Sequence, residues 1–128
     1  MKRVKIKYYT LVSHGAKSGF NYTTKFSNVS GSNATSLGIF KTAETYYGNN
    51  GYSLKLDGLS KNLNDQARNR YIVVHGATYA NPEAIVANGG KRLGRSQGCP
   101  ALPVSIAKQV INDIKGGSII YSHGVNKA

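Results

Sequence analysis

Alternation of apolar and polar residues along the chain predicts five β-strands. Near the start, Val4, Ile6 and Tyr8 alternate with Lys5 and Lys7, which is the period-2 pattern of a strand with one solvent-facing side. The apolar pattern continues to residue 12, so the first strand is predicted over 4–12. Short apolar runs bounded by glycine, asparagine or histidine predict four further strands, at 37–42, 52–57, 71–74 and 118–121.

Helical spacing of apolar residues is clear in one stretch, which predicts an amphipathic helix over 103–115. Pro103 suits its first turn, and the Gly116-Gly117 pair ends it. The apolar positions with this spacing are Val104, Ala107, Val110, Ile111 and Ile114. A second, short helix is predicted over 64–70, with Asn64 as its N-cap.

Together these elements predict a mainly β domain, a β-rich α+β fold with the amphipathic helix packed on the sheet. Residues 17–36 are rich in Ser, Asn, Thr and Gly and form a long connection. With 128 residues the chain is long enough for one core, so a single domain over 1–128 is expected.

The charge is strongly basic, since 17 Lys and Arg residues against 5 acids give a net charge of +12. This imbalance favours an anionic partner, but the basic residues are dispersed, so a solvated surface explains them equally well. The sequence has no apolar run of 18 residues and no apolar segment typical of a signal peptide. It therefore predicts no transmembrane segment and no export signal, although a trimmed exported protein would look the same.

The one cysteine of the chain, Cys99, lies in the stretch "GRSQGCPALP". A lone cysteine is commonly an inert buried residue, but this one sits in a predicted turn between a basic loop and a helix. Arg95 is four residues away, and the preceding Gly98 allows the backbone to approach a substrate carbonyl closely. Cys99 is therefore a candidate nucleophile if a histidine can take its proton.

The three histidines, His14, His75 and His123, each follow a predicted strand and precede glycine. Their spacing does not indicate which one partners Cys99. No short Cys/His spacing typical of zinc sites is present, and the five acids form no pair typical of glycosidases. Nucleotide-binding glycine motifs are also missing, so no metal and no cofactor is expected.

The stretch from "YIVVHGATY" to "GRSQGCPALP" resembles the L,D-transpeptidase catalytic domain family, the YkuD-type domain, in a subgroup where Pro-Ala follows the cysteine. The segments "TLVSHGAKSG", "TSLGIFKTAETYYGNNGYSLKLDGL" and "NDQARNR" are similar to family segments in the family order. The likeness extends over residues 8–121. The matching residues are His75-Gly76-Ala77, Gly94-Arg95-Ser96 and Gly98-Cys99-Pro100-Ala101.

The resemblance implies a YkuD-like β-sandwich or mixed sheet and assigns roles to the matching residues. Cys99 would be the nucleophile and His75 its base, held by a backbone carbonyl or a hydroxyl. The remaining candidates are Ser96 and Arg95 lining the site, the amides of Gly98 and Cys99 as oxyanion donors, and Arg92, His14 and Gly76 near the substrate. One departure is Ala101, which occupies a position where the broader family commonly has arginine; His123 is expected to be structural.

The resemblance also implies the substrate, the peptidoglycan stem peptides, and a periplasmic or cell-envelope location. Such enzymes cleave the bond between a diamino acid and a terminal D-alanine, then pass the acyl group to another stem. Transfer to water by an L,D-carboxypeptidase would use the same residues, so the two reactions remain alternatives. A noncatalytic basic binder of wall polymer or nucleic acid is the third alternative, although no nucleic-acid motif is present and no such partner is expected.

Overall fold

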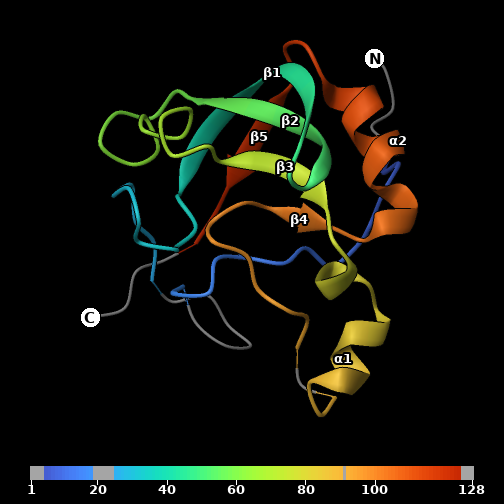
Figure 1. Ribbon diagram of the computed structural model, residues 1–128. Coiled ribbons are helices and arrows are strands. Elements are labelled where there is room, and N and C mark those ends of the chain that lie inside the picture. Colours follow the sequence, from blue (N-terminus) through green and yellow to red (C-terminus); the bar gives the residue numbers. More distant parts are fainter. Residues whose placement is uncertain (1–4, 19–24, 91, 125–128) are drawn as a thin grey trace.

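The computed structural model describes residues 5–18, 25–90 and 92–124, and within them five strands form one mixed sheet in the order β4-β3-β2-β1-β5 (Figure 1). Neighbouring strands are antiparallel except β3 and β4, which are parallel. The strands are β1 (Gly38–Gly48), β2 (Gly51–Gly58), β3 (Val73–Gly76), β4 (Ala101–Leu102) and β5 (Ile119–Ser122). This arrangement confirms the β-rich α+β fold, as a mixed sheet.

Four of the predicted strands correspond to β1, β2, β3 and β5. β1 extends six residues beyond the predicted end at residue 42, because its second half pairs with β2 although it is mostly polar and partly exposed. Asn49 and Asn50 connect the two strands, and the register shifts between Thr42 and Thr45. Cross-strand hydrogen bonding, rather than an apolar pattern, therefore defines this part of β1.

The predicted first strand is wrong for the described residues 5–12, which form no strand; Val4 lies outside the described residues. Ile6 and Leu11 are 79% and 60% exposed, so the alternating side chains have no sheet to pack on. Immediately after this segment, Ser13 exchanges both backbone hydrogen bonds with Ala101 of β4 (2.9 and 3.2 Å).

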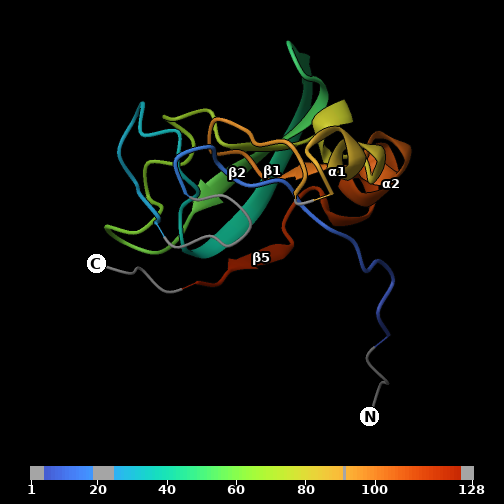
Figure 2. The ribbon, with the colours of Figure 1, turned by 90° about the horizontal axis from the view of Figure 1, so that it is seen from below.

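The amphipathic helix is confirmed as α2 (Val104–Ile114), with Ala107 and Ile111 buried. It packs against β3, where a Cβ on Gly76 would lie 2.8 Å from the Cβ of Ala107. Glycine at this position therefore allows the close approach of helix and strand. Both helices lie toward one end of the strands, at the right of Figure 1 and Figure 2.

The predicted helix over 64–70 is wrong, since residues 61–71 form a series of turns. Asn64 is fully buried, and its side chain accepts the N–H of Ser60 (2.9 Å) and donates to the carbonyl of Ile39 (3.0 Å). Asn64 thus ties the turns to β1 instead of capping a helix. The short helix lies elsewhere, at α1 (Glu83–Ala87), after the 3₁₀ turn η1 (Thr78–Ala80).

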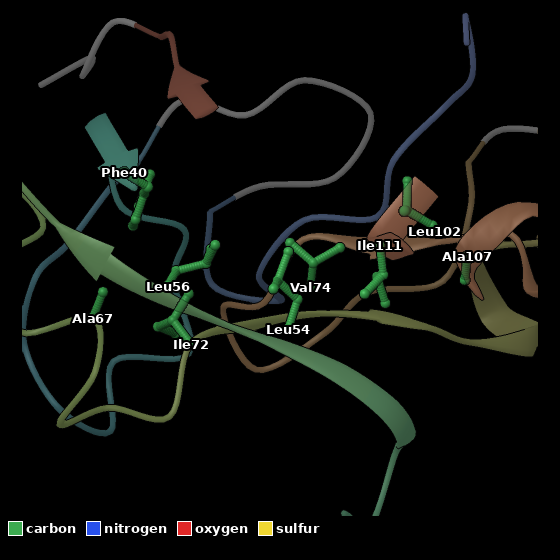
Figure 3. Close-up of a cluster of buried hydrophobic side chains, with 9 residues drawn as sticks. All are labelled: Phe40, Leu54, Leu56, Ala67, Ile72, Val74, Leu102, Ala107 and Ile111. Atoms are coloured by element: carbon green, nitrogen blue, oxygen red, sulfur yellow. The ribbon is translucent and has the colours of Figure 1, made fainter. Parts of the chain in front are cut away.

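The hydrophobic core lies between the sheet and α2 (Figure 3). Leu54 and Val74 face each other across β2 and β3, and Ile111 of α2 is fully buried against the same cluster. The other members are Phe40, Leu56, Ala67, Ile72, Leu102 and Ala107. Because side chains alternate along a strand, Val73 and His75 lie on the opposite face of β3 from Val74.

Candidate active site

Cys99 lies just before β4 and beside Val73, because His75 pairs with Ala101 in the parallel register. Its Sγ accepts the backbone N–H of Val73 (3.4 Å) and donates to the carbonyl of Tyr71 (3.5 Å). The thiol is half-buried and packs against the edge of the core. The parallel pairing of β3 and β4 therefore positions this thiol, rather than an exposed turn.

A cleft of about 1020 Å³ opens beside Cys99. The tip of the β1–β2 hairpin, the end of the turns at 70–73, the loop at 95–97 and Tyr79 all contribute to its walls. Its charged lining residues are Arg70 and Arg95. A cleft with these two guanidinium groups is suited to an anionic substrate such as a peptide carboxylate.

Burial raises the pKa of the Cys99 thiol, and this effect is larger than the two that oppose it. The N–H of Val73 and the positive charge of Arg70 both lower the pKa, because each stabilises the thiolate. The balance favours a protonated thiol at rest, so the attack on a substrate requires a group that removes the proton.

His75 lies on the same face of β3 as Val73, two residues further along, and is 2% exposed. Its Nδ1 is 3.0 Å from the carbonyl of Gly76, and since a carbonyl only accepts, this bond requires the proton on Nδ1. Nε2 is then the nitrogen that can accept a proton. The ring of Tyr79 meets the His75 ring edge-on, with 6.5 Å between centroids.

The hydrogen bonds of the described residues do not include one between Cys99 and His75. Cys99 contacts Val73, and two residues along a strand span about 7 Å, so the thiol lies roughly that far along β3 from His75. Active-site hydrogen bonds are commonly long before substrate binds. The described structure therefore places His75 near the thiol without a direct hydrogen bond between them.

Ser96 fixes the loop that carries the cysteine. Its Oγ donates to the Cys99 carbonyl (2.6 Å) and accepts the N–H of Gly98 (3.1 Å). Gly98 has a φ of +119°, and a Cβ there would lie 2.9 Å from the carbonyl oxygen of Ala34, so only glycine suits the position. With the Gly98 N–H bound to Ser96, the amide of Cys99 is the better candidate oxyanion donor.

The other candidates lie in different places. Arg95 lines the cleft, and its Nη1 donates to the carbonyl of Ala16 (3.1 Å). Arg92 instead donates to the carbonyl of Leu93, outside the lining of the cleft. His14 borders a separate apolar cavity of about 420 Å³ on the core side of the sheet. Gly76 packs on α2, so its contribution to the site is the carbonyl that holds His75.

Ala101 is fully buried between Ser13 on one side and His75 on the other. A long side chain has no space there, which accounts for the absence of arginine at this position. The basic residues of the cleft, Arg70 and Arg95, come from other segments. Sequence reasoning missed Arg70, Tyr79 and the Val73 amide as site groups, since only the tertiary fold brings them to Cys99.

Comparison with known protein families places these observations in context. Residues 1–123 match the family described as L,D-transpeptidase catalytic domain. The chain belongs to this family. Comparison with curated proteins gave no match, and comparison with solved structures gave none.

The family implies an enzyme of the L,D-transpeptidase kind that acts on peptidoglycan. The described part of the chain contains no group of three or more His, Cys, Asp or Glu side chains that could hold a metal ion. None of the described helices is long and apolar enough to cross a bilayer.

Proposed function

We propose that this L,D-transpeptidase family member is a cysteine acyltransferase of peptidoglycan stem peptides, with Cys99 as nucleophile and His75 as base. The observation that carries the proposal is the register of β3 and β4, which brings Cys99 beside Val73, two residues before His75, with the thiol at a large cleft that holds two arginines. The family match over residues 1–123 supports the substrate class. We also propose that residues 1–128 act as one catalytic domain in the cell envelope, where this polymer lies.

In the first half-reaction, Sγ of Cys99 attacks the carbonyl carbon of the diamino acid that precedes the terminal D-alanine, and His75 Nε2 takes the thiol proton. The Cys99 amide stabilises the resulting oxyanion. The C–N bond then breaks, and the proton on Nε2 passes to the nitrogen of the departing D-alanine. A thioester on Cys99 remains.

In the second half-reaction, the amine of another stem attacks the thioester carbon and gives a proton to His75. The S–C bond breaks, a new amide forms, and the thiolate regains its proton from His75. Water in place of the amine would release a free tripeptide. Arg95, at the mouth of the cleft, would bind a stem carboxylate by charge-assisted hydrogen bonds.

The test is incubation with tetrapeptide stems followed by mass analysis of the products. Cross-linked dimers are expected from the wild type, whereas tripeptide and free D-alanine alone would indicate the carboxypeptidase reaction. Cys99→Ser should abolish both products, and a carbapenem should add its mass to the wild type but not to this variant.

Histidine variants test the base and supply a matched control. His75→Ala should lower the acylation rate by about 100-fold or more, since general base catalysis contributes on that order. His123→Ala removes an exposed histidine next to Tyr121 on β5 and should leave the rate unchanged. A larger loss in His14→Ala than in His75→Ala would contradict the assignment of the base. Full reactivity of Cys99→Ala would contradict the enzyme and favour a binding protein.

A further inference from the structure

Arg70 holds one wall of the Cys99 cleft through the segment 27–36. Its Nη1 donates to the carbonyl of Ser27 (2.8 Å) and to Oγ of Ser36 (2.6 Å). Its Nη2 donates to Oγ of Ser32 (3.1 Å) and to the carbonyl of Ala34 (2.8 Å). The four N–H groups of the two terminal nitrogens are thus all engaged, which fixes the guanidinium in one position.

All four partners of Arg70 are neutral, so its positive charge is not balanced by a carboxylate among the described residues. Arg68, only two residues earlier, is the opposite case. It is exposed and binds both Asp57 (2.6 Å) and Glu44 (2.9 Å). The charge of Arg68 is therefore neutralised by carboxylates, whereas the charge of Arg70 can act on other groups near it.

The unbalanced charge of Arg70 lies directly behind the cysteine loop. A Cβ placed on Gly98, the residue before Cys99, would be 3.2 Å from Nη2 of Arg70. Arg70 and Cys99 also line the same cleft. Because both residues are partly buried, water screens the charge of Arg70 from the thiolate less than it screens a surface charge.

We propose that Arg70 is a positioning residue for the reaction at Cys99, holding the 27–36 wall against the cysteine loop while its unneutralised charge stabilises the thiolate. This inference rests on the proposed function, in which Cys99 is the nucleophile. The charge of Arg70 lowers the pKa of Cys99, although burial, the largest effect, raises it. Burial likewise lowers the pKa of Arg70, and the Cys99 thiolate opposes that shift.

The other ionisable groups described on this side of the molecule are His75, Tyr46, Tyr71, Tyr79 and Arg95. Burial, and secondarily the Cys99 thiolate, raise the pKa of Tyr79, so it stays neutral around pH 7. Tyr71 is largely exposed. Arg95 is the second cation of the cleft, and it is present in every variant below, so comparisons among them isolate Arg70.

The two parts of the proposal predict opposite changes in thiol acidity. Loss of the wall alone would hydrate the thiol, and since burial raises its pKa, hydration would lower it. Loss of the positive charge of Arg70 would instead raise the pKa of Cys99. The sign of the change therefore separates an electrostatic role from a purely structural one.

The experiment measures the rate of Cys99 alkylation by iodoacetamide against pH, by intact mass, in the wild type and in Arg70→Met, Arg70→Lys and Arg68→Met. Arg70→Met should move the midpoint of the profile to higher pH and lower the rate at pH 7.5 by about three- to tenfold. Arg68→Met, which removes an arginine already paired with two carboxylates, should leave the midpoint unchanged. A midpoint in Arg70→Met that is unchanged or lower than in the wild type would overturn the proposal.

Arg70→Lys keeps the charge but cannot reproduce four fixed hydrogen bonds. Its thermal unfolding midpoint should fall, while its alkylation midpoint stays at or below the wild-type value, because the charge remains and a loosened wall only hydrates the thiol. If Arg70→Met does not fold, Arg70→Gln, which is neutral but still donates hydrogen bonds, replaces it, and an alkylation midpoint in Arg70→Gln that is not above that of Arg70→Lys would overturn the electrostatic role. Because iodoacetamide needs no stem peptide, a wild type with the expected profile but no acylation by stems would contradict the proposed function and leave the role of Arg70 intact.

Discussion

At the scale of single residues, the face of the sheet that carries His75 is a row of small buried side chains. Ser13, Ala101, His75 and Ser53 lie side by side across the strands, each at most 2% exposed. Ser53 Oγ donates to the carbonyl of Gly51 (3.1 Å). Ser13 Oγ is the one buried side-chain oxygen or nitrogen without a hydrogen-bond partner among the described residues.

Ser13→Ala is therefore expected to raise the free energy of unfolding, by about 1 kcal/mol, because a hydroxyl buried without a partner is desolvated at a net cost. Its place in the sheet rests on backbone hydrogen bonds with Ala101, which alanine retains. Urea denaturation provides the measurement. Ser53→Ala is the matched control and should lower stability by about 1 kcal/mol, since it removes a hydrogen bond that is made. A loss of stability in Ser13→Ala would show that its hydroxyl has a partner.

The identity of the candidate nucleophile and base could be inferred from the sequence, but their surroundings could not. The family resemblance selected Cys99 and His75, whereas local context placed Cys99 in an exposed turn. In the structure, Tyr71 and Val73 bind its Sγ, 28 and 26 residues away along the chain. No local pattern encodes a contact between parallel strands, and none distinguishes Arg70, which binds a distant segment, from Arg68, which binds two acids.

At the scale of elements, the side chain of Thr42 joins β1 to the end of α2. Its Oγ1 donates to the carbonyl of Ile114 (2.5 Å) in the last turn of the helix. It also accepts the N–H groups of Gly117 (3.1 Å) and Ser118 (2.8 Å), which lead into β5. One buried hydroxyl thus satisfies a helix carbonyl and two loop amides that have left the regular hydrogen-bond pattern.

Thr42→Val is expected to lower the free energy of unfolding by about 2 kcal/mol, because valine keeps the shape but removes the three hydrogen bonds that Oγ1 makes. Thr42→Ser keeps the hydroxyl and loses one methyl group, which should cost only about 1 kcal/mol. Chemical denaturation of the two variants beside the wild type gives the comparison. A Thr42→Val variant as stable as Thr42→Ser would mean that these hydrogen bonds contribute little.

The elements that sequence patterns predicted well are those whose apolar faces meet the core. α2 and the central strands have such faces. The predictions that were wrong concern two kinds of segment: one whose apolar residues have no sheet to pack on, and one whose structure is held by contacts with residues distant in sequence. The described residues 5–12 of the alternating segment have no neighbouring strand, and the turns at 61–71 are held by the buried side chain of Asn64. α1, with five residues, is too short to show a helical period.

At the scale of the whole molecule, the net charge of +12 reflects only five acids, and three of these form ion pairs with basic residues that the structure describes. Arg68 bridges Glu44 of β1 and Asp57 of β2, and Lys7 binds Asp113 of α2 (2.9 Å), which Tyr8 also contacts. The acids on β1, β2 and α2 thus bind basic side chains from segments distant in sequence. Their protonation would remove these links and add to the positive charge at the same time.

Acid should destabilise the protein in a window that these carboxylates define. The hydrogen bonds from Arg68 lower the pKa of Glu44 to about 2 and also lower the pKa of Asp57, while those from Tyr8 and Lys7 lower the pKa of Asp113. Carboxyl groups whose pKa is depressed by folding contribute stability above the unfolded pKa of about 4, and that contribution is lost as pH falls toward 2. Each pair is solvent-exposed, so its share is small and falls with added salt.

Thermal unfolding of the wild type and of Arg68→Met between pH 7 and pH 2, at low ionic strength, separates the ion pairs from general charge repulsion. Both proteins gain positive charge as their acids are protonated, so both should lose stability. Only the wild type loses the Arg68 pairs, so its unfolding midpoint should fall more steeply below pH 4.5, and the difference between the two proteins should shrink toward pH 2. Parallel curves over the whole range would mean that the network formed by Arg68, Glu44 and Asp57 adds nothing to stability, and that repulsion among the basic residues alone governs acid unfolding.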